Sequence, residues 1–308
     1  LAVGMSGNFR QMKRRILNIA VFRKETLYQK MRALIIYLVI SAVFIGCTPI
    51  LSIDASTQSV YHFSDTDKNI SLLDISETFG TYDGSFVLYD NNLDSWKIYN
   101  LEEATKRIPP ESTYKIYDAL LGLESGIITP EHSSMTWNGD AFPFPSWEAD
   151  QDLNSAMQNS VNWYFQAIDS QLGINRVQEF LNKIEYGNQT TSSNLDLYWS
   201  DFSLKISPLE QVTLLKKFNT NEFHLNSQNV FSVKNAIKIA STPNGNFYGK
   251  TGTGRVNGQD INGWFIGYVE TSDNSYYFAT NIQSDSNATG KKAFEITSDI
   301  LKKLHIWN

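Results

Sequence analysis

The pattern of apolar and polar positions changes twice along this chain. Two runs rich in aromatic and β-branched residues, 84–90 and 96–100, flank Asn91-Asn92 and predict a pair of strands joined by a turn. From Leu101 to about Ile239 the helical period dominates. Its apolar residues are spaced for helices over 112–123, 152–169, 174–183 and 207–217.

Strand character returns near the end of the chain. Aromatic and β-branched residues mark three further strands, and an apolar stripe follows them. The predicted strands are 246–253, 262–270 and 276–282, and the stripe predicts a closing helix over about 289–304. This order predicts an α+β fold, in which an antiparallel sheet is flanked by helices and has a separate helical lobe.

Two segments outside this pattern also affect the prediction. Residues 53–80 are polar and weakly patterned, so we interpret them as a linker and an entry segment. Ser207-Pro208-Leu209-Glu210 forms a capping box with proline at the first helical position, which predicts a helix start there.

The first fifty residues have a composition of their own. Residues 1–32 carry eight basic residues and one acidic residue, a net charge of +7, and residues 33–52 are uncharged and mostly apolar. About 20 apolar residues are needed to cross a bilayer, and basic residues remain on the cytoplasmic side. We therefore expect a basic cytoplasmic segment over 1–32, a transmembrane helix over 33–52 and an extracytoplasmic domain over 53–308. The chain begins at Leu1, so it is interpreted as a possible fragment.

Other interpretations of the apolar run stay open. A cleaved signal peptide could start at Met31, although a single charge gives it a thin basic region. Phe44-Ile45-Gly46-Cys47 loosely resembles a lipoprotein signal, although Phe44 fits its first position poorly. A buried core helix is disfavoured by the dense basic flank.

Composition excludes several other classes of function for residues 33–308. The whole chain carries −6, so these residues carry −13, which argues against nucleic-acid binding. Cys47 is the single cysteine, so no internal disulfide framework is possible. The four histidines are scattered without metal-ligand spacing, and no glycine-rich phosphate loop follows a strand. We therefore expect no metal ion or cofactor.

Ser112 and Lys115 stand three residues apart, directly after Pro109-Pro110 and at the predicted start of a helix. This spacing puts both side chains on one helix face. A lysine kept neutral by burial can take the serine proton, and free N–H groups at the helix start favour an oxyanion. Taken alone, Ser-x-x-Lys is more often a helix cap followed by a solvated lysine.

Further short motifs follow Ser112 in a fixed order. Ser160-Val161-Asn162 lies within the predicted helix around Met157 to Ile168, and Tyr186-Gly187-Asn188 follows a helix end. Lys250-Thr251-Gly252-Thr253-Gly254 lies on the first late strand. Each motif is weak alone, but all of them in this order behind Ser-x-x-Lys form a specific signal.

With these motifs the chain resembles the penicillin-recognising serine proteins, which carry Ser-x-x-Lys, Ser-x-Asn and Lys-Thr-Gly. Within them it is similar to the class D β-lactamases and to the sensor domains of BlaR/MecR-type β-lactam receptors, over about Asp54 to Asn308. The resemblance implies a serine β-lactamase or penicillin-binding transpeptidase-like fold. The basic segment and membrane span that precede this domain resemble the last transmembrane helix of the receptors. An upstream zinc protease part would then be absent here, since no His-Glu-x-x-His occurs.

The resemblance also implies roles for individual residues. Ser112 would be the nucleophile that opens the lactam ring, and Lys115 its base, which can carry a carbamate derived from carbon dioxide. Ser160 would pass a proton toward the lactam nitrogen. Lys250, Thr251 and Gly252 would form the ligand-binding Lys-Thr-Gly edge. The N–H groups of Ser112 and Thr253 would form the oxyanion hole, and Trp199 would steady the modified lysine.

Asn162 helps to separate a receptor from a hydrolase. Class D hydrolases usually have an apolar residue at this position, and a carbamate needs a neutral amine in a dry pocket. An amide beside Lys115 would compete with the carbamate, so the acyl-serine would persist. We therefore expect a membrane-anchored receptor that β-lactam antibiotics acylate covalently.

Two alternatives to the receptor are kept. The first is a class D β-lactamase, secreted or lipid-anchored, that hydrolyses β-lactams through the same acyl-serine. The second is a non-enzymatic adhesion or structural domain in which the motifs are vestigial. Asn162 facing away from Lys115 would also remove the argument for a receptor.

Overall fold

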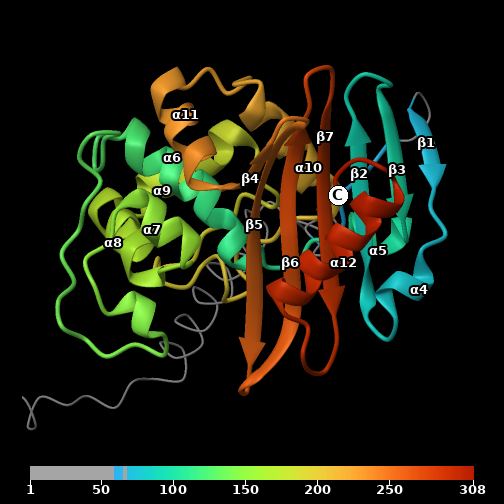
Figure 1. Ribbon diagram of the computed structural model, residues 1–308. Helices are drawn as coiled ribbons and strands as arrows, with labels where there is room; N and C mark the ends of the chain where they lie inside the picture. The colour runs from blue at the N-terminus through green and yellow to red at the C-terminus, as the bar shows by residue number, and fades with distance from the viewer. Residues whose placement is uncertain (1–58, 65–67) are drawn as a thin grey trace, which may run out of the picture. The chain divides into compact units, whose positions relative to one another are not determined.

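A seven-stranded sheet forms the centre of the computed structural model, which describes residues 59–64 and 68–308 (Figure 1). Its strand order is β1-β3-β2-β7-β6-β5-β4. The strands are β1 (Asn69–Leu72), β2 (Asp83–Asp90), β3 (Ser95–Tyr99), β4 (Lys238–Thr242), β5 (Gly245–Val256), β6 (Gln259–Glu270) and β7 (Ser275–Gln283). The first hairpin thus joins the last three strands through the antiparallel pairing of β2 with β7.

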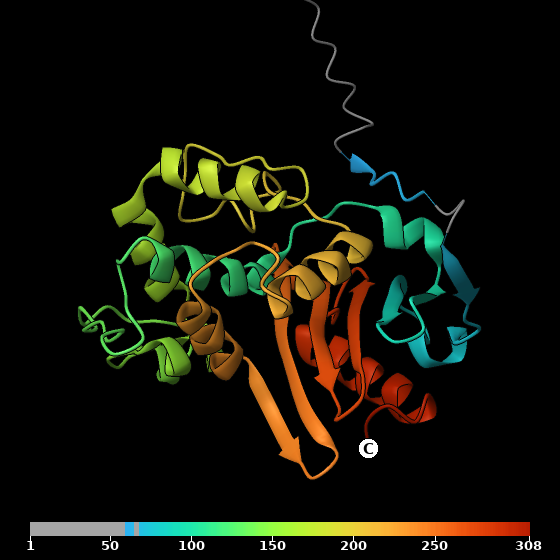
Figure 2. The same cartoon turned by 90° about the horizontal axis from the view of Figure 1, so that it is seen from above.

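Helices cover both faces of this sheet (Figure 2). On one face, α12 (Gly290–Lys303) packs on β5, β6 and β7 over a core rich in phenylalanine, and α4 (Ser76–Phe79) packs beside it. On the other face, α10 (Pro208–Asn219) packs on β2, β6 and β7, with α5 (Leu101–Thr105) next to it. Buried apolar residues therefore lie on both sides of the central strands, as burial of a sheet between helices requires.

A group of helices forms a lobe beside the β4–β5 edge (Figure 1). Its members are η1 (Glu111–Tyr114), α6 (Lys115–Glu124), η2 (Pro145–Trp147), α7 (Leu153–Gln158), α8 (Asn162–Leu172), α9 (Ile174–Ile184) and α11 (Ser227–Ala236). Within the lobe, α6 packs against α7, α8 and α11, and α9 packs against α8. Because η1 also contacts β5 and β6, the start of α6 lies where the lobe meets the sheet.

The sheet is mixed, which corrects the expectation of a purely antiparallel one. Residues 69–72, within the stretch interpreted as a linker, form β1 and pair in parallel with β3. Residues 238–242 form the edge strand β4 directly after α11, where the helical period had been expected to end. Both are short edge strands. The partner of β1 lies about 26 residues along the chain, and β4 forms a hairpin with β5 but directly follows a helix, so local periodicity gives little sign of either.

Two helix predictions also need correction. The predicted helix over 152–169 is broken, because α7 ends at Gln158 and α8 begins at Asn162. Ser160 lies in this break with φ of +53°, outside the helical region. The helix expected to start at Ser112 begins with a tight 3₁₀ turn, and regular α-helix follows only from Lys115.

The helix starting at Pro208 is confirmed, together with its capping box. The Ser207 hydroxyl accepts a hydrogen bond from the Glu210 N–H, and the Glu210 carboxylate accepts one from the Ser207 N–H. The predicted transmembrane segment over 33–52 and the basic segment over 1–32 lie outside the described residues. Among residues 59–64 and 68–308, no helix combines the length and the apolar character that crossing a bilayer requires.

Candidate functional site

The segment before Ser112 is fixed to the sheet by hydrogen bonds to one carbonyl. The Pro109 oxygen accepts from Trp264 Nε1 at 2.9 Å and from Asn262 Nδ2 at 3.1 Å, both of β6. On the other side, Ile108 forms an isolated bridge with Ile206. The proline pair ends this extended segment, so η1 begins at a defined place beside the sheet.

Ser112 and Lys115 point toward each other and toward Asn162. The Lys115 amine nitrogen lies 2.9 Å from Ser112 Oγ and donates a hydrogen bond to Asn162 Oδ1 at 2.7 Å. Asn162 is the first residue of α8, so the break after α7 brings its amide to the start of α6. The serine hydroxyl and the amine are therefore within direct proton-transfer distance.

Burial changes the acid–base behaviour of Lys115. Its side chain is fully buried, and the amine lies 5.3 Å from the ring centre of Trp199 and 5.6 Å from that of Phe165. Loss of solvation lowers the pKa of Lys115 to about 8, against the opposing effect of nearby carboxyl groups. A substantial fraction of the amine is therefore neutral near neutral pH and can act as a base.

Ser160 and Lys250 form a second pair across the cavity. The Lys250 amine donates to Ser160 Oγ and, at 3.0 Å, to the Thr251 carbonyl oxygen. Burial lowers the pKa of Lys250 well below its ordinary value, and the positive charge of Lys115 adds to this effect. The left-handed backbone at Ser160 turns its hydroxyl out of the helical path toward β5.

The Lys-Thr-Gly strand passes very close to Ser112. A Cβ atom built on Gly252 would lie 3.2 Å from the Ser112 nitrogen and 3.1 Å from the Pro110 oxygen. Such contacts are tighter than most real Cβ contacts, so glycine permits this approach. Thr253 follows on the same strand, and its hydroxyl accepts a hydrogen bond from the Gly290 N–H at 2.8 Å, at the start of α12.

These residues surround an open cavity of about 370 Å³. Of the site residues predicted from sequence, six line it: Ser112, Ser160, Asn162, Thr251, Gly252 and Thr253. Lys115, Lys250 and Trp199 lie behind this surface, in the buried layer. The structure thus brings all nine predicted residues to one place, where the lobe meets the sheet.

Sequence reasoning missed other residues of this cavity. Phe144 and Trp147 come from the long connection between α6 and α7, and their rings pack together with centres 5.2 Å apart. Arg255 and Asp260 come from the β5–β6 hairpin, where Arg255 Nε donates to Asp260 Oδ1 at 2.7 Å. None of them belongs to a motif, so only the fold brings them to the site.

Glu111, directly before Ser112, is a further residue of the site that sequence reasoning missed. It is buried with φ of +53°, which is uncommon for a non-glycine residue, and its N–H donates to the Trp199 carbonyl at 3.1 Å. Its carboxyl Oε1 accepts from Asn262 Nδ2 at 3.3 Å, and burial raises the pKa of Glu111 to about 8. The residues of this motif must be buried, and an acidic residue among them is the sequence signal that would have identified Glu111.

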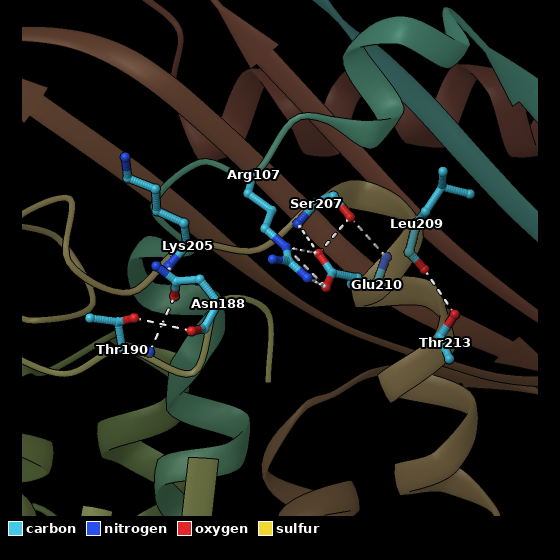
Figure 3. Close-up of polar contacts among 8 residues, drawn as sticks. All are labelled: Arg107, Asn188, Thr190, Lys205, Ser207, Leu209, Glu210 and Thr213. Atoms are coloured by element: carbon cyan, nitrogen blue, oxygen red, sulfur yellow. Dashed lines mark hydrogen bonds and ion pairs between the residues drawn. The ribbon is translucent and has the colours of Figure 1, made fainter. Parts of the chain in front are cut away.

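The Tyr186-Gly187-Asn188 motif supports the loop that carries Trp199, and Figure 3 shows its contact between Asn188 and Lys205. Asn188 Oδ1 accepts from the Lys205 N–H at 2.9 Å, and Asn188 Nδ2 donates to the Ser203 carbonyl at 2.7 Å. A Cβ atom on Gly187 would lie 1.9 Å from the Lys205 oxygen, so this backbone contact needs glycine. The motif therefore acts by holding the 199–206 segment in place.

An ion pair between Arg107 and Glu210 lies just beyond this segment (Figure 3). Arg107 Nε donates to Glu210 Oε2 at 2.9 Å, and Arg107 Nη2 donates to Oε1 at 2.5 Å. Glu210 also belongs to the capping box with Ser207. This bidentate ion pair links the extended segment before Ser112 to the start of α10.

The described part of the chain contains no group of three histidine, cysteine, aspartate or glutamate residues placed to hold a metal ion. The cavity and the layer behind it offer the Ser112 and Ser160 hydroxyls, two buried amines and the backbone N–H groups of η1 and β5.

Comparison with known proteins agrees with this arrangement. The family described as "Penicillin binding protein transpeptidase domain" matches residues 77–302. The regulatory protein BlaR1 of Bacillus licheniformis is 43% identical over 305 residues, which are 98% of this chain and 50% of that protein. This chain therefore spans about half the length of the curated relatives that it matches most strongly.

Two solved structures place the fold. The C-terminal domain of the Bacillus licheniformis BlaR penicillin receptor is 46% identical with a TM-score of 0.76, covering 79% of this chain and 99% of that one. A class D β-lactamase from Bacillus subtilis is 35% identical with a TM-score of 0.72, covering 80% of this chain and 100% of that one. The fold is thus the penicillin-binding transpeptidase fold, with a mixed sheet flanked by helices.

Proposed function

This chain belongs to the penicillin-binding transpeptidase domain family, and we propose that it is the sensor part of a membrane-anchored β-lactam receptor that is acylated at Ser112. The adduct is long-lived and signals the induction of resistance. Two observations support this proposal. The cavity holds a serine with a buried amine at 2.9 Å, and the BlaR penicillin receptor domain is similar over nearly its whole length.

Acylation follows from the geometry around Ser112. The neutral Lys115 amine takes the hydroxyl proton while Ser112 Oγ forms a bond to the lactam carbonyl carbon. The N–H groups of Ser112 and Thr253 stabilise the oxyanion. When the lactam C–N bond breaks, Ser160 gives its proton to the nitrogen and takes one from the Lys250 amine that donates to it, while the proton from Ser112 stays on Lys115. Ring opening thus leaves an ester on Ser112 and an amine on the ligand.

Ligand recognition is assigned to the β5 edge. The Thr251 side chain binds the carboxylate that β-lactams carry, the Lys250 amine behind it contributes its positive charge, and Gly252 lets the strand approach the reacting carbonyl. Phe144 and Trp147 offer an apolar surface on the opposite side of the cavity, suited to the side chain of the antibiotic.

A long adduct lifetime is supported by the bond between Lys115 and Asn162. Deacylation needs a base that activates water, and in this fold class a carbamate on Lys115 would supply it. The Trp199 and Phe165 rings give the dry surroundings that a carbamate needs. Asn162 Oδ1, however, faces the amine at 2.7 Å and would repel the carbamate oxygens. Within the cavity, this hydrogen bond is the observation that favours a receptor over a hydrolase.

The test uses the 53–308 segment in soluble form, provided that it unfolds cooperatively. Benzylpenicillin is added at equimolar amount, and the intact mass is followed over hours. We expect one adduct of the antibiotic mass that persists, and none in Ser112→Ala. Rapid return to the unmodified mass would overturn the receptor proposal, and absence of any adduct would overturn acylation itself.

The second candidate is a class D β-lactamase acting through the same acyl-serine. It is favoured by the aromatic enclosure of Lys115 and by the similar class D structures. Many turnovers of nitrocefin per protein molecule, with acceleration by added bicarbonate, would select this candidate.

We further propose the membrane arrangement expected from sequence: residues 1–32 cytoplasmic, 33–52 transmembrane and 53–308 extracytoplasmic. The supporting observations are the +7 charge of the first segment and the uncharged run that follows it. The BlaR1 relative is about twice as long as this chain, and the similar BlaR structure is a C-terminal domain, which supports our proposal of a metalloprotease part earlier in a longer chain. Protease protection in intact cells tests this topology, since the domain should be cleaved from outside.

A further inference from the structure

Two helices of the lobe face each other in matched layers. On α6, Lys115 and Asp118 lie three residues apart and therefore on one face. On α8, Asn162 and Asp169 lie seven residues apart and share a face in the same way. The Lys115–Asn162 hydrogen bond forms the layer at the cavity, and the helices approach closely again at Gly122, where an added Cβ would lie 3.0 Å from Ile168.

Asp118 and Asp169 occupy the layer beneath Lys115, and the mechanism above uses neither of them. Both are fully buried. Tyr198 OH donates to Asp169 Oδ1 at 3.3 Å, next to Trp199, which covers Lys115. Among the described residues, no N–H or hydroxyl group donates to either oxygen of Asp118.

A fully buried carboxyl group that receives no hydrogen bond from an N–H or hydroxyl group must be stabilised in another way. The carboxyl of Asp169 on the facing helix is the partner of Asp118, and its Oδ2 also has no hydrogen-bond donor among the described residues. Ionised carboxylates only accept hydrogen bonds, so two that face each other must hold a proton between them. Burial agrees with this, because it raises the pKa of Asp118 to about 8 and that of Asp169 well above its ordinary range.

We propose that Asp118 and Asp169 form a proton-sharing carboxyl pair beneath Lys115, and that the pair controls the charge of the Lys115 amine. Both are positioning residues, since neither reaches the cavity. The inference rests on the proposed acylation of Ser112, whose rate depends on the neutral amine. A negative charge on the pair stabilises the ammonium form, whereas a second proton on the pair removes this stabilisation.

Other titratable groups also surround Lys115 and must be included. They are Glu111 from η1, Lys250 from β5, and the buried hydroxyls of Tyr114 and Tyr198 beside the carboxyl pair. Ionised Glu111 would stabilise the ammonium as Asp118 does, and Lys250 would oppose it. Asp118 is nevertheless the neighbour with the largest charge effect on Lys115, so its removal has a definite sign.

The experiment measures the second-order rate constant for acylation of Ser112 by a fluorescent penicillin as a function of pH. The proteins are wild type, Asp118→Asn and the double variant Asp118→Asn/Asp169→Asn. The double variant removes the negative charge of the pair from beside the amine, so we expect the midpoint of its pH profile to fall by about one unit or more. Asp118→Asn alone leaves Asp169 able to ionise, so its midpoint should fall less. Asp90→Asn, which removes a buried carboxyl of β2, is the matched control and should keep the wild-type midpoint.

A purely structural role would change protein yield or the plateau rate but would leave the midpoint in place. Folded variants with the wild-type midpoint would therefore overturn the proposal. A second measurement needs no acylation. At about pH 7, infrared spectra should show a protonated-carboxyl band in Glu111→Gln, which removes the further buried acid of the described residues whose pKa is raised, and should lose it when both aspartates become asparagine. Absence of that band in Glu111→Gln would overturn the carboxyl pair, even if Ser112 proves unreactive.

Discussion

The amide oxygen of Asn162 lies 2.7 Å from the amine nitrogen of Lys115, and the same nitrogen lies 2.9 Å from Ser112 Oγ. One buried amine is thus shared between the group that it must activate and a side chain that holds it in place. The hydroxyl can lose its proton to this amine, while the amide oxygen occupies the side from which carbon dioxide would add.

Replacing Asn162 tests this division of roles. Asn162→Val removes the acceptor, so the amine is free to form a carbamate in its apolar surroundings. We expect deacylation of the penicillin adduct to become at least roughly tenfold faster in bicarbonate buffer, equivalent to about 1.4 kcal/mol in the barrier. The measurement is adduct lifetime by intact mass.

Asn159→Ala is the matched control for that variant. Asn159 lines the same cavity, but its amide nitrogen donates to the Ser155 carbonyl. Among the described residues, no hydrogen bond joins Asn159 to Lys115. It should keep the wild-type lifetime. An equally stable adduct in Asn162→Val would show that the amide does not govern deacylation.

Ser160 is expected to affect acylation through its bond with Lys250. Ser160→Ala removes the hydroxyl that the Lys250 amine contacts and interrupts proton delivery to the lactam nitrogen. We expect acylation to slow on the order of 100-fold, as for loss of a positioned proton-transfer group. Stopped-flow mixing with a fluorescent penicillin measures it. Ser146→Ala, which changes another serine of the cavity, should change the rate by less than about twofold, and similar losses in both variants would contradict the assignment.

Stability should depend on pH through Glu111. Its pKa is raised to about 8 in the folded protein by burial, above the ordinary value of 4.5, so the folded state holds a proton that the unfolded state releases. The contribution is fully present below about 4.5 and is lost as the pH rises to about 8. We expect the free energy of unfolding to fall by on the order of a few kcal/mol as the pH rises from about 4.5 to about 8.

Urea unfolding at a series of pH values measures this effect. Glu111→Gln keeps the shape and the bond with Asn262 without the titration, so its slope between these pH values should be clearly shallower. Asp118, whose pKa is also raised to about 8, should leave part of the slope in place. Identical slopes for wild type and variant would contradict the protonated state of Glu111.

The Arg107–Glu210 pair should be important for folding. Arg107→Ala leaves the Glu210 carboxylate largely buried with only its capping partners, so we expect a loss of about 3 kcal/mol in the free energy of unfolding. Lys292→Ala, at the exposed pair with Glu295, should cost less than about 0.5 kcal/mol. Comparable small losses in urea unfolding would show that the buried pair adds little.

Local signals account for the parts of the fold that sequence predicted well. The α10 start was predicted because the Ser207–Glu210 box and Pro208 are contiguous, and the late strands have long aromatic and β-branched runs. By contrast, β1 is defined by a partner distant in the chain, as in the pairing of Asn69 with Ser95, so no local window contains the contact on which it depends. β4 was missed for another reason: it is a five-residue strand that directly follows α11, although its partner β5 comes next in the chain.

The site divides in the same way. Ser112, Lys115 and Lys250 lie in motifs whose spacing carries the chemistry, so sequence alone named them. The break at Ser160 was missed because the surrounding apolar spacing continues as if one helix ran through it. The Asp118–Asp169 layer was also missed, since each aspartate looks like an ordinary helix residue until the two helices are packed.

The close passage of β5 over η1 restricts how this protein can vary in sequence. A Cβ atom at Gly254 would lie 2.4 Å from Glu111 Oε1, and one at Gly252 would lie 3.0 Å from Glu111 Cβ. A methyl group at position 254 is therefore compatible only with a shorter or displaced side chain at position 111. Homologues should thus exchange these two positions together, and a library that randomises either one alone should recover few functional clones.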